Sequence, residues 1–313
     1  MKISIIGKGG AGKSTLTSLI SLYLSNKNFK VAVFDADINM HIKDIFGIET
    51  VDKLNLSDPK NVLKIREYLS GTNKRVSPTK FVKTTPPGNG SNFFSVDENN
   101  YLIKNYGQKI KDNLYLFCVG SYKGELAGLS CYHTNLAIFE NILSHSKLSK
   151  NQVIVADMVA GIDNIANSLF LQFDIQFFAI EPTFESVSVY KKYIDEIKKT
   201  PYKIKIFPIL NKVDNVDDIN FTRSHIGKNL IILNKNSSIN KLSKRIININ
   251  EILKDKQILK FLNELTHLIK KIEIDPNIKL KELILLHKQY IKLDYVRRAY
   301  GDLSYQIDEN FKF

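Results

Sequence analysis

The residues best suited to chemistry lie within the first fifteen positions. Gly7-Lys8-Gly9-Gly10-Ala11-Gly12-Lys13-Ser14-Thr15 combines closely spaced glycines with lysines and two hydroxyl groups. Glycines let the backbone wrap a phosphate so closely that successive N–H groups point at its oxygens. In this pattern Lys13 would hold the β and γ phosphates, Ser14 would bind Mg²⁺, and Thr15 would reach the α phosphate. The motif, a full Walker A match, therefore predicts a nucleoside triphosphate site.

Carboxylates follow two of the apolar runs farther along the chain. Asp35 and Asp37 end the first of these runs, and Asp37 comes 24 residues after Lys13. Both carboxylates could simply cap the next helix. Asp157 ends another apolar run and suits a water ligand of Mg²⁺. The turn Ala160-Gly161 after it suits a hinge that senses the γ phosphate.

The periodicity of hydrophobic residues predicts the elements that position these side chains. Nearly continuous apolar runs are typical of strands buried on both faces. We predict strands at 3–6, 30–34, 114–119, 152–157, 175–181, 204–210 and 230–233. Amphipathic segments predict helices at 13–24, 164–171 and 184–199. The alternation predicts an α/β fold, a mostly parallel, doubly wound sheet of the P-loop NTPase type with a basic helical extension at its C-terminal end.

Two regions fall outside this alternation. Residues 71–100 are rich in Pro, Gly, Asn and Thr, which predicts a long excursion without regular elements. After residue 238 the pattern is helical and rich in lysine, with helices expected at 239–247, 258–272 and 279–300. We therefore divide the chain into a P-loop domain at 1–245 and a basic amphipathic helical extension at 246–313.

The net charge of +13 is unevenly placed along the chain. Residues 221–300 hold 17 basic and 7 acidic side chains, a net of +10, so the rest of the chain carries only +3. Such a surface suits an acidic or polyanionic partner. The abundance of Lys, Asn and Ile also indicates AT-rich coding bias, which would explain the charge without any function.

Cysteine content and hydropathy indicate the compartment. Cys118 and Cys131 are too few for a disulfide framework, and no Cys-x-x-Cys pair is present. The first residues lack the apolar core of a signal peptide, and no apolar run approaches the roughly 20 residues of a membrane span. We therefore expect a cytoplasmic protein.

Lys8 makes the phosphate-binding motif more specific. It resembles the signature lysine of the deviant Walker A ATPases, which include the Min and Par positioning ATPases, the nitrogenase iron protein and the nickel-insertion ATPases. In that group two subunits face each other across sandwiched nucleotides, and the signature lysine reaches into the partner's site. The resemblance implies a homodimer that forms on ATP binding and hydrolyses ATP to ADP and phosphate. It also implies catalytic roles for Lys8, Lys13 and Asp37. Asp37 would lie in switch I and orient or deprotonate the attacking water, while Asp35 would brace that loop or the Mg²⁺ shell.

A second nucleotide motif, Asn211-Lys212-Val213-Asp214, follows another apolar run. Alone it spells the guanine motif of small GTPases, whereas in the deviant Walker A group the equivalent Asn contacts adenine, so ATP is favoured over GTP. The residues expected to bind the nucleotide are Gly7, Gly9, Gly10, Ala11, Gly12, Lys13, Ser14, Thr15, Asn211 and Lys212. Ser14 and Asp157 are expected at Mg²⁺.

Over residues 1–245 the chain is similar to the nickel-insertion ATPases of carbon monoxide dehydrogenase maturation (CooC type). The similarity lies in Asp35-Ala36-Asp37-Ile38-Asn39, in Asp157-Met158-Val159-Ala160-Gly161 and in Leu210-Asn211-Lys212-Val213. That family carries a Cys-x-Cys pair where this chain has only Cys131, with His133 close by. One thiolate and one imidazole per subunit would give a dimer four ligands for Ni²⁺ or Zn²⁺, although both residues could simply pack at an interface. Cys118, at the end of an apolar run, is expected in the core.

The resemblance favours an ATP-dependent switch that serves a client metalloprotein during its maturation. The alternative is a ParA/MinD-like partitioning or positioning ATPase that binds DNA or a membrane surface through its basic C-terminal helices. A GTP-dependent metallochaperone is a third interpretation. A membrane is disfavoured because the helix of Min-type proteins is terminal, whereas this chain continues through Asp302, Asp308 and Glu309.

Overall fold

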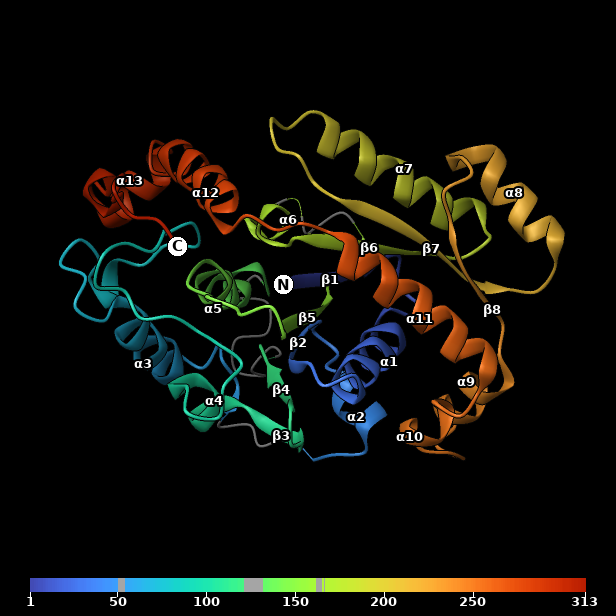
Figure 1. Ribbon diagram of the computed structural model, residues 1–313. Helices are drawn as coiled ribbons and strands as arrows, with labels where there is room; N and C mark the ends of the chain where they lie inside the picture. Colours follow the sequence, from blue (N-terminus) through green and yellow to red (C-terminus); the bar gives the residue numbers. More distant parts are fainter. Residues whose placement is uncertain (50–53, 121–131, 162–164, 166) are drawn as a thin grey trace.

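The computed structural model describes residues 1–49, 54–120, 132–161, 165 and 167–313 (Figure 1). Within these residues the centre of the molecule is an eight-stranded sheet in the order β3-β4-β2-β5-β1-β6-β7-β8. Every neighbouring pair is parallel except β3 with β4. The strands are β1 (Lys2–Gly7), β2 (Lys30–Ala36), β3 (Gln108–Lys111), β4 (Leu114–Cys118), β5 (Gln152–Met158), β6 (Ile175–Ile180), β7 (Ile206–Val213) and β8 (Ile231–Asn234). The predicted mostly parallel α/β sheet is confirmed.

Helices cover both faces of the sheet because alternate strand residues enter two different cores. Phe34 and Phe178 point into the first core and Val33 and Phe177 into the second. The first core is covered by α3 (Pro59–Ser70), α4 (Tyr101–Tyr106), α5 (Tyr132–Ser144), α6 (Leu169–Gln172), α7 (Phe184–Lys198) and α8 (Val216–Ile226). The second is covered by α1 (Lys13–Asn26), α2 (Ile42–Phe46), α9 (Ser237–Ser243), α10 (Ile249–Ile252) and α11 (Lys256–Lys271). The doubly wound arrangement is therefore confirmed.

Several elements differ from their sequence prediction. The single helix expected at 279–300 is wrong, because α12 (Pro276–Tyr290) and α13 (Asp294–Tyr300) are separate helices with three residues between them. The helix expected at 239–247 ends at Ser243, and Asn248 caps the separate α10 through a capping box with Glu251. The helix α3 was missed although Asp58 caps it and proline occupies its first position. The helix expected at 164–171 is described only as the short α6, since 162–164 and 166 lie outside the described residues.

The excursion at 71–100 is mostly irregular, as expected, with one short 3-10 helix at Pro78–Lys80. It is held down by the end of the chain. Asp308 accepts hydrogen bonds from the backbone N (3.0 Å) and Nδ2 (2.8 Å) of Asn89, and Lys80 donates to the carbonyl of Tyr300 at 2.8 Å. The sequence after α11 therefore packs against the excursion, as Figure 1 shows for α12 and α13.

The lysine-rich segment that begins at residue 246 contributes to the sheet's own core. Ile252, Phe261 and Leu265 are buried in the same core as Val33, and α11 lies beside α1. Their lysines point outward, so the amphipathic pattern reflects packing on the domain. The boundary at 245 stays a prediction. Among the described residues, no helix combines the length and apolarity that crossing a bilayer would require.

Candidate functional site

The phosphate loop, residues Gly7–Thr15, connects the end of β1 to the first turn of α1. A Cβ on Gly7 would lie 2.4 Å from the carbonyl oxygen of Ala179, and one on Gly12 would lie 2.5 Å from Nδ2 of Asn211. Both glycines also have positive φ, 144° and 88°, which side-chain-bearing residues rarely adopt. The loop can therefore take this path only with glycine at these two positions, and it leaves the N-terminal N–H groups of α1 aimed at the site.

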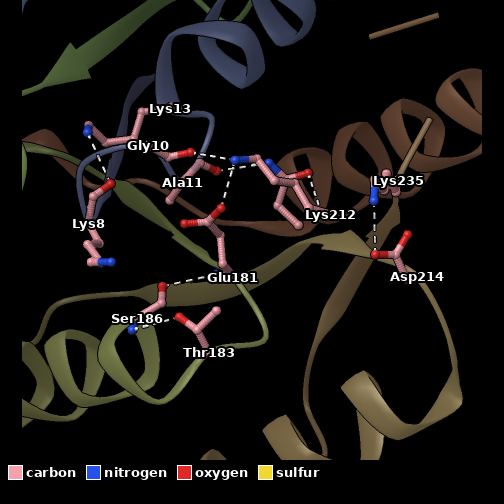
Figure 2. A network of polar contacts seen from close by, with 11 residues as sticks. Lys8, Gly10, Ala11, Lys13, Glu181, Thr183, Ser186, Lys212, Asp214 and Lys235 are labelled. Atoms are coloured by element: carbon pink, nitrogen blue, oxygen red, sulfur yellow. Dashed lines mark hydrogen bonds and ion pairs between the residues drawn. The ribbon is translucent and has the colours of Figure 1, made fainter. Parts of the chain in front are cut away.

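The two lysines of the loop differ in their surroundings. The side chain of Lys13 is only 7% exposed and folds back so that Nζ lies 3.4 Å from the carbonyl oxygen of Lys8. In Figure 2 the ammonium of Lys8 points away from that of Lys13. Lys13 is thus placed to meet a phosphate held in the loop, whereas Lys8 is directed elsewhere.

The expected Mg²⁺ residues Ser14 and Asp157 meet directly, because α1 begins where β5 ends. Ser14 Oγ donates to Asp157 Oδ2 at 2.5 Å, and Asp157 is fully buried. Burial raises the pKa of Asp157 to about 7, opposed by the Ser14 hydrogen bond and the charge of Lys13. Within the described part of the chain, Asp157 Oδ1 has no hydrogen-bond partner. An orphaned carboxylate oxygen beside a serine hydroxyl fits a hard cation such as Mg²⁺, which takes oxygen ligands.

Asp35 lies beside Asp157 in the sheet, since their Cα atoms are register partners on β2 and β5. Asp35 is fully buried, and its Oδ2 accepts from the backbone N of Ile42 at 3.0 Å. Burial, followed by the charge of Asp157, raises the pKa of Asp35 well above its usual value. Asp35 thus ties the loop after β2 to α2.

Asp37 is partly exposed on that same loop. Its Oδ1 accepts from the backbone N and Nδ2 of Asn39, both at 3.1 Å, and Oδ2 takes no part in these bonds. The structure therefore brings Asp37 to the edge of the sheet where β5 ends, and a water molecule can reach it. Its catalytic role stays a prediction.

The residues expected at the base hold the phosphate loop from the other side (Figure 2). Asn211 Nδ2 donates to the carbonyl of Ala11 at 2.8 Å, and its Oδ1 accepts from the backbone N of Lys212. Lys212, at a φ of 61°, donates to the carbonyl of Gly10 and to Oε1 of Glu181, both at 2.7 Å. The amide of Asn211 is therefore engaged with the loop, and its contact with a base stays a prediction.

Asp214, the residue that would read guanine in a GTPase, forms an ion pair with Lys235 at 3.1 Å.

Glu181 was missed by the sequence analysis. The available signal was its position directly after an apolar strand that neighbours β1, since carboxyl ends of parallel strands collect at one edge.

The predicted transition-metal residues can be placed only in part. Cys131 and the side chain of His133 lie outside the described residues, so the Ni²⁺ or Zn²⁺ site stays a prediction. Cys118 is buried in the second core, as expected. Among the side chains that the structure describes, no group of three or more His, Cys, Asp or Glu residues gathers as a metal site would require.

The chain is similar to known proteins over most of its length. Residues 3–275 match the model of the CobQ/CobB/MinD/ParA nucleotide binding domain. An uncharacterised ATP-binding protein of Methanocaldococcus jannaschii is 31% identical over 222 residues, which cover 69% of this chain and 80% of that protein. The carbon monoxide dehydrogenase accessory protein CooC of Rhodospirillum rubrum is 23% identical over 221 residues, 71% of this chain and 78% of CooC. A 48-residue stretch is 52% identical to the iron-sulfur cluster carrier protein of Rickettsia felis, 15% of each chain.

Solved structures resemble the fold. A ParA family ATPase from Chlorobium tepidum has a TM-score of 0.58 at 14% identity, covering 83% of this chain and 95% of that one. The septum site-determining protein MinD from Pyrococcus horikoshii, solved with Mg-ADP, has a TM-score of 0.53 at 17% identity, covering 86% and 96%. At such identities the likeness concerns the arrangement of sheet and helices.

Proposed function

This chain belongs to the CobQ/CobB/MinD/ParA family of nucleotide-binding domains, and from that premise we propose that it is a Mg²⁺-dependent ATP hydrolase that works as a dimerising switch. The observation that supports the proposal is the contact between Ser14 and the buried Asp157, the two residues that we propose as Mg²⁺ ligands, beside the phosphate loop. Lys13 adds the charge that stabilises the transferring phosphoryl group, and Asp37 holds the attacking water.

Dimerisation is the part of the proposal that depends on Lys8. Its ammonium points away from the loop of its own subunit, as a residue that serves a facing subunit would. In the ATP-bound dimer, the Lys8 side chains supply positive charge across the interface as hydrolysis proceeds, in the manner of an arginine finger.

The variant Lys8→Ala tests this mechanism. We expect it to bind ATP with nearly unchanged affinity as a monomer and to lose hydrolysis by at least about 100-fold, because the cross-subunit charge is gone. The measurements are ATP affinity by calorimetry, mass by light scattering, and phosphate release. Lys109→Ala, on the exposed strand β3, is the matched control. Hydrolysis by Lys8→Ala at the parent rate would mean that the site is complete within one subunit.

We further propose that the switch serves the maturation of a metalloprotein. The support is the similarity to CooC over 71% of this chain, together with Cys131 and His133 two residues apart. Titration of the ATP-bound dimer with Ni²⁺ and Zn²⁺ tests the proposal, with Cys131→Ser as the control. Stoichiometric binding that is lost in the variant is expected. Salt-dependent DNA binding without metal binding would favour the partitioning alternative. In that case the exposed lysines Lys256, Lys260 and Lys270 would contact the DNA phosphates.

A further inference from the structure

A cavity of about 750 Å³ opens at the amino edge of the sheet, where β1 and β5 begin. The phosphate loop lies at the other end of β1, so the cavity is separate from the nucleotide site. In Figure 1 the linker from α11 to α12 passes this edge, beside the start of β1. Most of the wall is apolar and includes Phe29, Leu148, Ile269, Ile272, Leu280 and Leu283. The volume is typical of sites that enclose small organic molecules.

Two lysine side chains give the cavity a positive character. Lys2 Nζ donates to the carbonyl of Leu143 at 3.3 Å, and burial lowers the pKa of its ammonium. The charge of Asp174 raises this pKa, and that of Lys279 lowers it. Lys2 and Lys279 are therefore close enough to repel each other, and an anion between them would relieve the repulsion.

The acidic groups at the cavity offset only part of this charge. Asp174 accepts from the backbone N of Lys2 at 2.7 Å, and Lys279 pairs with Glu282 at 3.0 Å. Glu273 also lines the cavity, but so do Lys150 and Lys270. Four lysines and three carboxylates therefore lie at the cavity, and this balance of side-chain charge favours one negative charge on a ligand.

A buried amide connects the cavity to the first core. Gln172 lines the cavity, is 2% exposed, and has no hydrogen-bond partner for its Oε1 among the described residues. Its Nε2 donates to Ser168 Oγ at 2.8 Å. Ser168 in turn donates to Oε1 of Glu140 on α5 through its hydroxyl at 2.8 Å and its backbone N at 2.6 Å.

We propose that this cavity binds an amphipathic carboxylate, with the buried Gln172 amide as one of its polar partners. The carboxylate lies between Lys2 and Lys279, and the apolar part of the molecule lies against the walls formed by α11 and α12. The Gln172 amide then turns its Nε2 to the carboxylate and its free Oε1 to the Ser168 hydroxyl. Because that hydroxyl has only one proton, it then releases Glu140.

Calorimetric titration of the full chain with decanoate, without nucleotide, tests the site. Decanoate is expected to bind, while decanol and decylamine, which lack the negative charge, bind at least tenfold more weakly. Lys2→Met and Lys279→Met are each expected to weaken decanoate binding at least tenfold, and Leu283→Trp to abolish it by filling the cavity. Lys109→Met is the control and binds as the parent does. The proposal would be wrong if decanoate did not bind or if decanol bound equally well. It would also be wrong if both lysine variants bound decanoate with the affinity of the parent.

Discussion

The two edges of the sheet both enclose lysine ammonium groups, but they surround them differently. At the carboxyl edge, Lys13 lies in a loop whose glycines present backbone N–H groups, and its neighbours Ser14 and Asp157 are polar. At the amino edge, Lys2 and Lys279 lie against mostly apolar walls, and one buried amide oxygen has no partner within the described structure. The first edge has many donors in a short loop, whereas the second has few donors beside a large apolar surface.

The difference shows how each edge selects its ligand. Backbone N–H groups cost no side-chain entropy to position, so a glycine loop can surround a polyphosphate that carries several charges. A cavity with two ammonium groups and apolar walls stabilises one charge and gains the rest of its binding from apolar burial. The following variants are chosen to separate the two edges.

The largest expected effect is at the carboxyl edge. Lys13→Ala removes the ammonium beside the phosphates and should lower kcat/KM for ATP by more than about 1000-fold, because charge-assisted hydrogen bonds in a buried site are strong. Decanoate affinity should remain that of the parent. Steady-state kinetics and calorimetry measure the two quantities on one preparation. A loss of decanoate binding in this variant would show that the edges are one cooperative unit.

Asp37→Ala tests the chemical step within the same edge. Turnover should fall by about 100- to 1000-fold while ATP affinity stays close to that of the parent, since general-base or water-orienting groups contribute this much. The ATP-bound dimer should then accumulate, which light scattering detects. A variant that hydrolyses ATP normally would assign the attacking water to another residue.

The carboxyl edge could be predicted from the sequence because its residues are close together or follow recognisable strands. The phosphate loop is one run of nine residues, and Asp157 follows an apolar run that fixes both its strand and its end. The site at the amino edge could not be predicted, because Lys2, Gln172 and Lys279 come from distant parts of the chain and none of them belongs to a motif. Only the parallel packing of β1 beside β6, and of α12 near both, brings them together.

The same reasoning explains the fold predictions that failed. Continuous apolar runs identified the buried strands, because a strand covered on both faces needs no polar side. The antiparallel β3, QKIK, is the outermost strand of the sheet, is partly exposed and has no such run. The break between α12 and α13 was hidden because the apolar spacing continues through Ile291 and Leu293, while the chain turns.

The buried Glu140, on α5, makes the free energy of unfolding depend on pH. Burial raises the pKa of this carboxyl to about 7, opposed by Lys83 and the bonds from Ser168. The folded state therefore holds the proton more tightly than the unfolded chain, and the free energy of unfolding falls as pH rises from about 4.5 to 7. Glu140→Gln removes this dependence but keeps an oxygen for Ser168.

Chemical denaturation of both proteins at several pH values measures the difference. The parent should lose up to about 3 kcal/mol more than the variant over this range, since one pKa unit corresponds to about 1.4 kcal/mol. Asp35 and Asp157 titrate in the same direction, but both proteins carry them, so their contribution cancels. Parallel curves for the two proteins would mean that Glu140 is ionised in the folded state.

The smallest expected effect concerns the C-terminal segment that completes the amino edge. Asp308→Ala removes both hydrogen bonds from Asn89 and should lower the free energy of unfolding by about 1–2 kcal/mol, because two hydrogen bonds to a charged, buried carboxylate are lost. Since this segment leads back to α12 through the bond from Phe313 N to Asn277 Oδ1, decanoate binding should weaken a few-fold. Asp302→Ala, whose carboxylate accepts hydrogen bonds from Ser304 two residues further on, is the control. The affinity for ATP should be equal in the parent and both variants, because these carboxylates lie apart from the phosphate loop. An altered ATP affinity in Asp308→Ala alone would show that the C-terminal segment also supports the carboxyl edge.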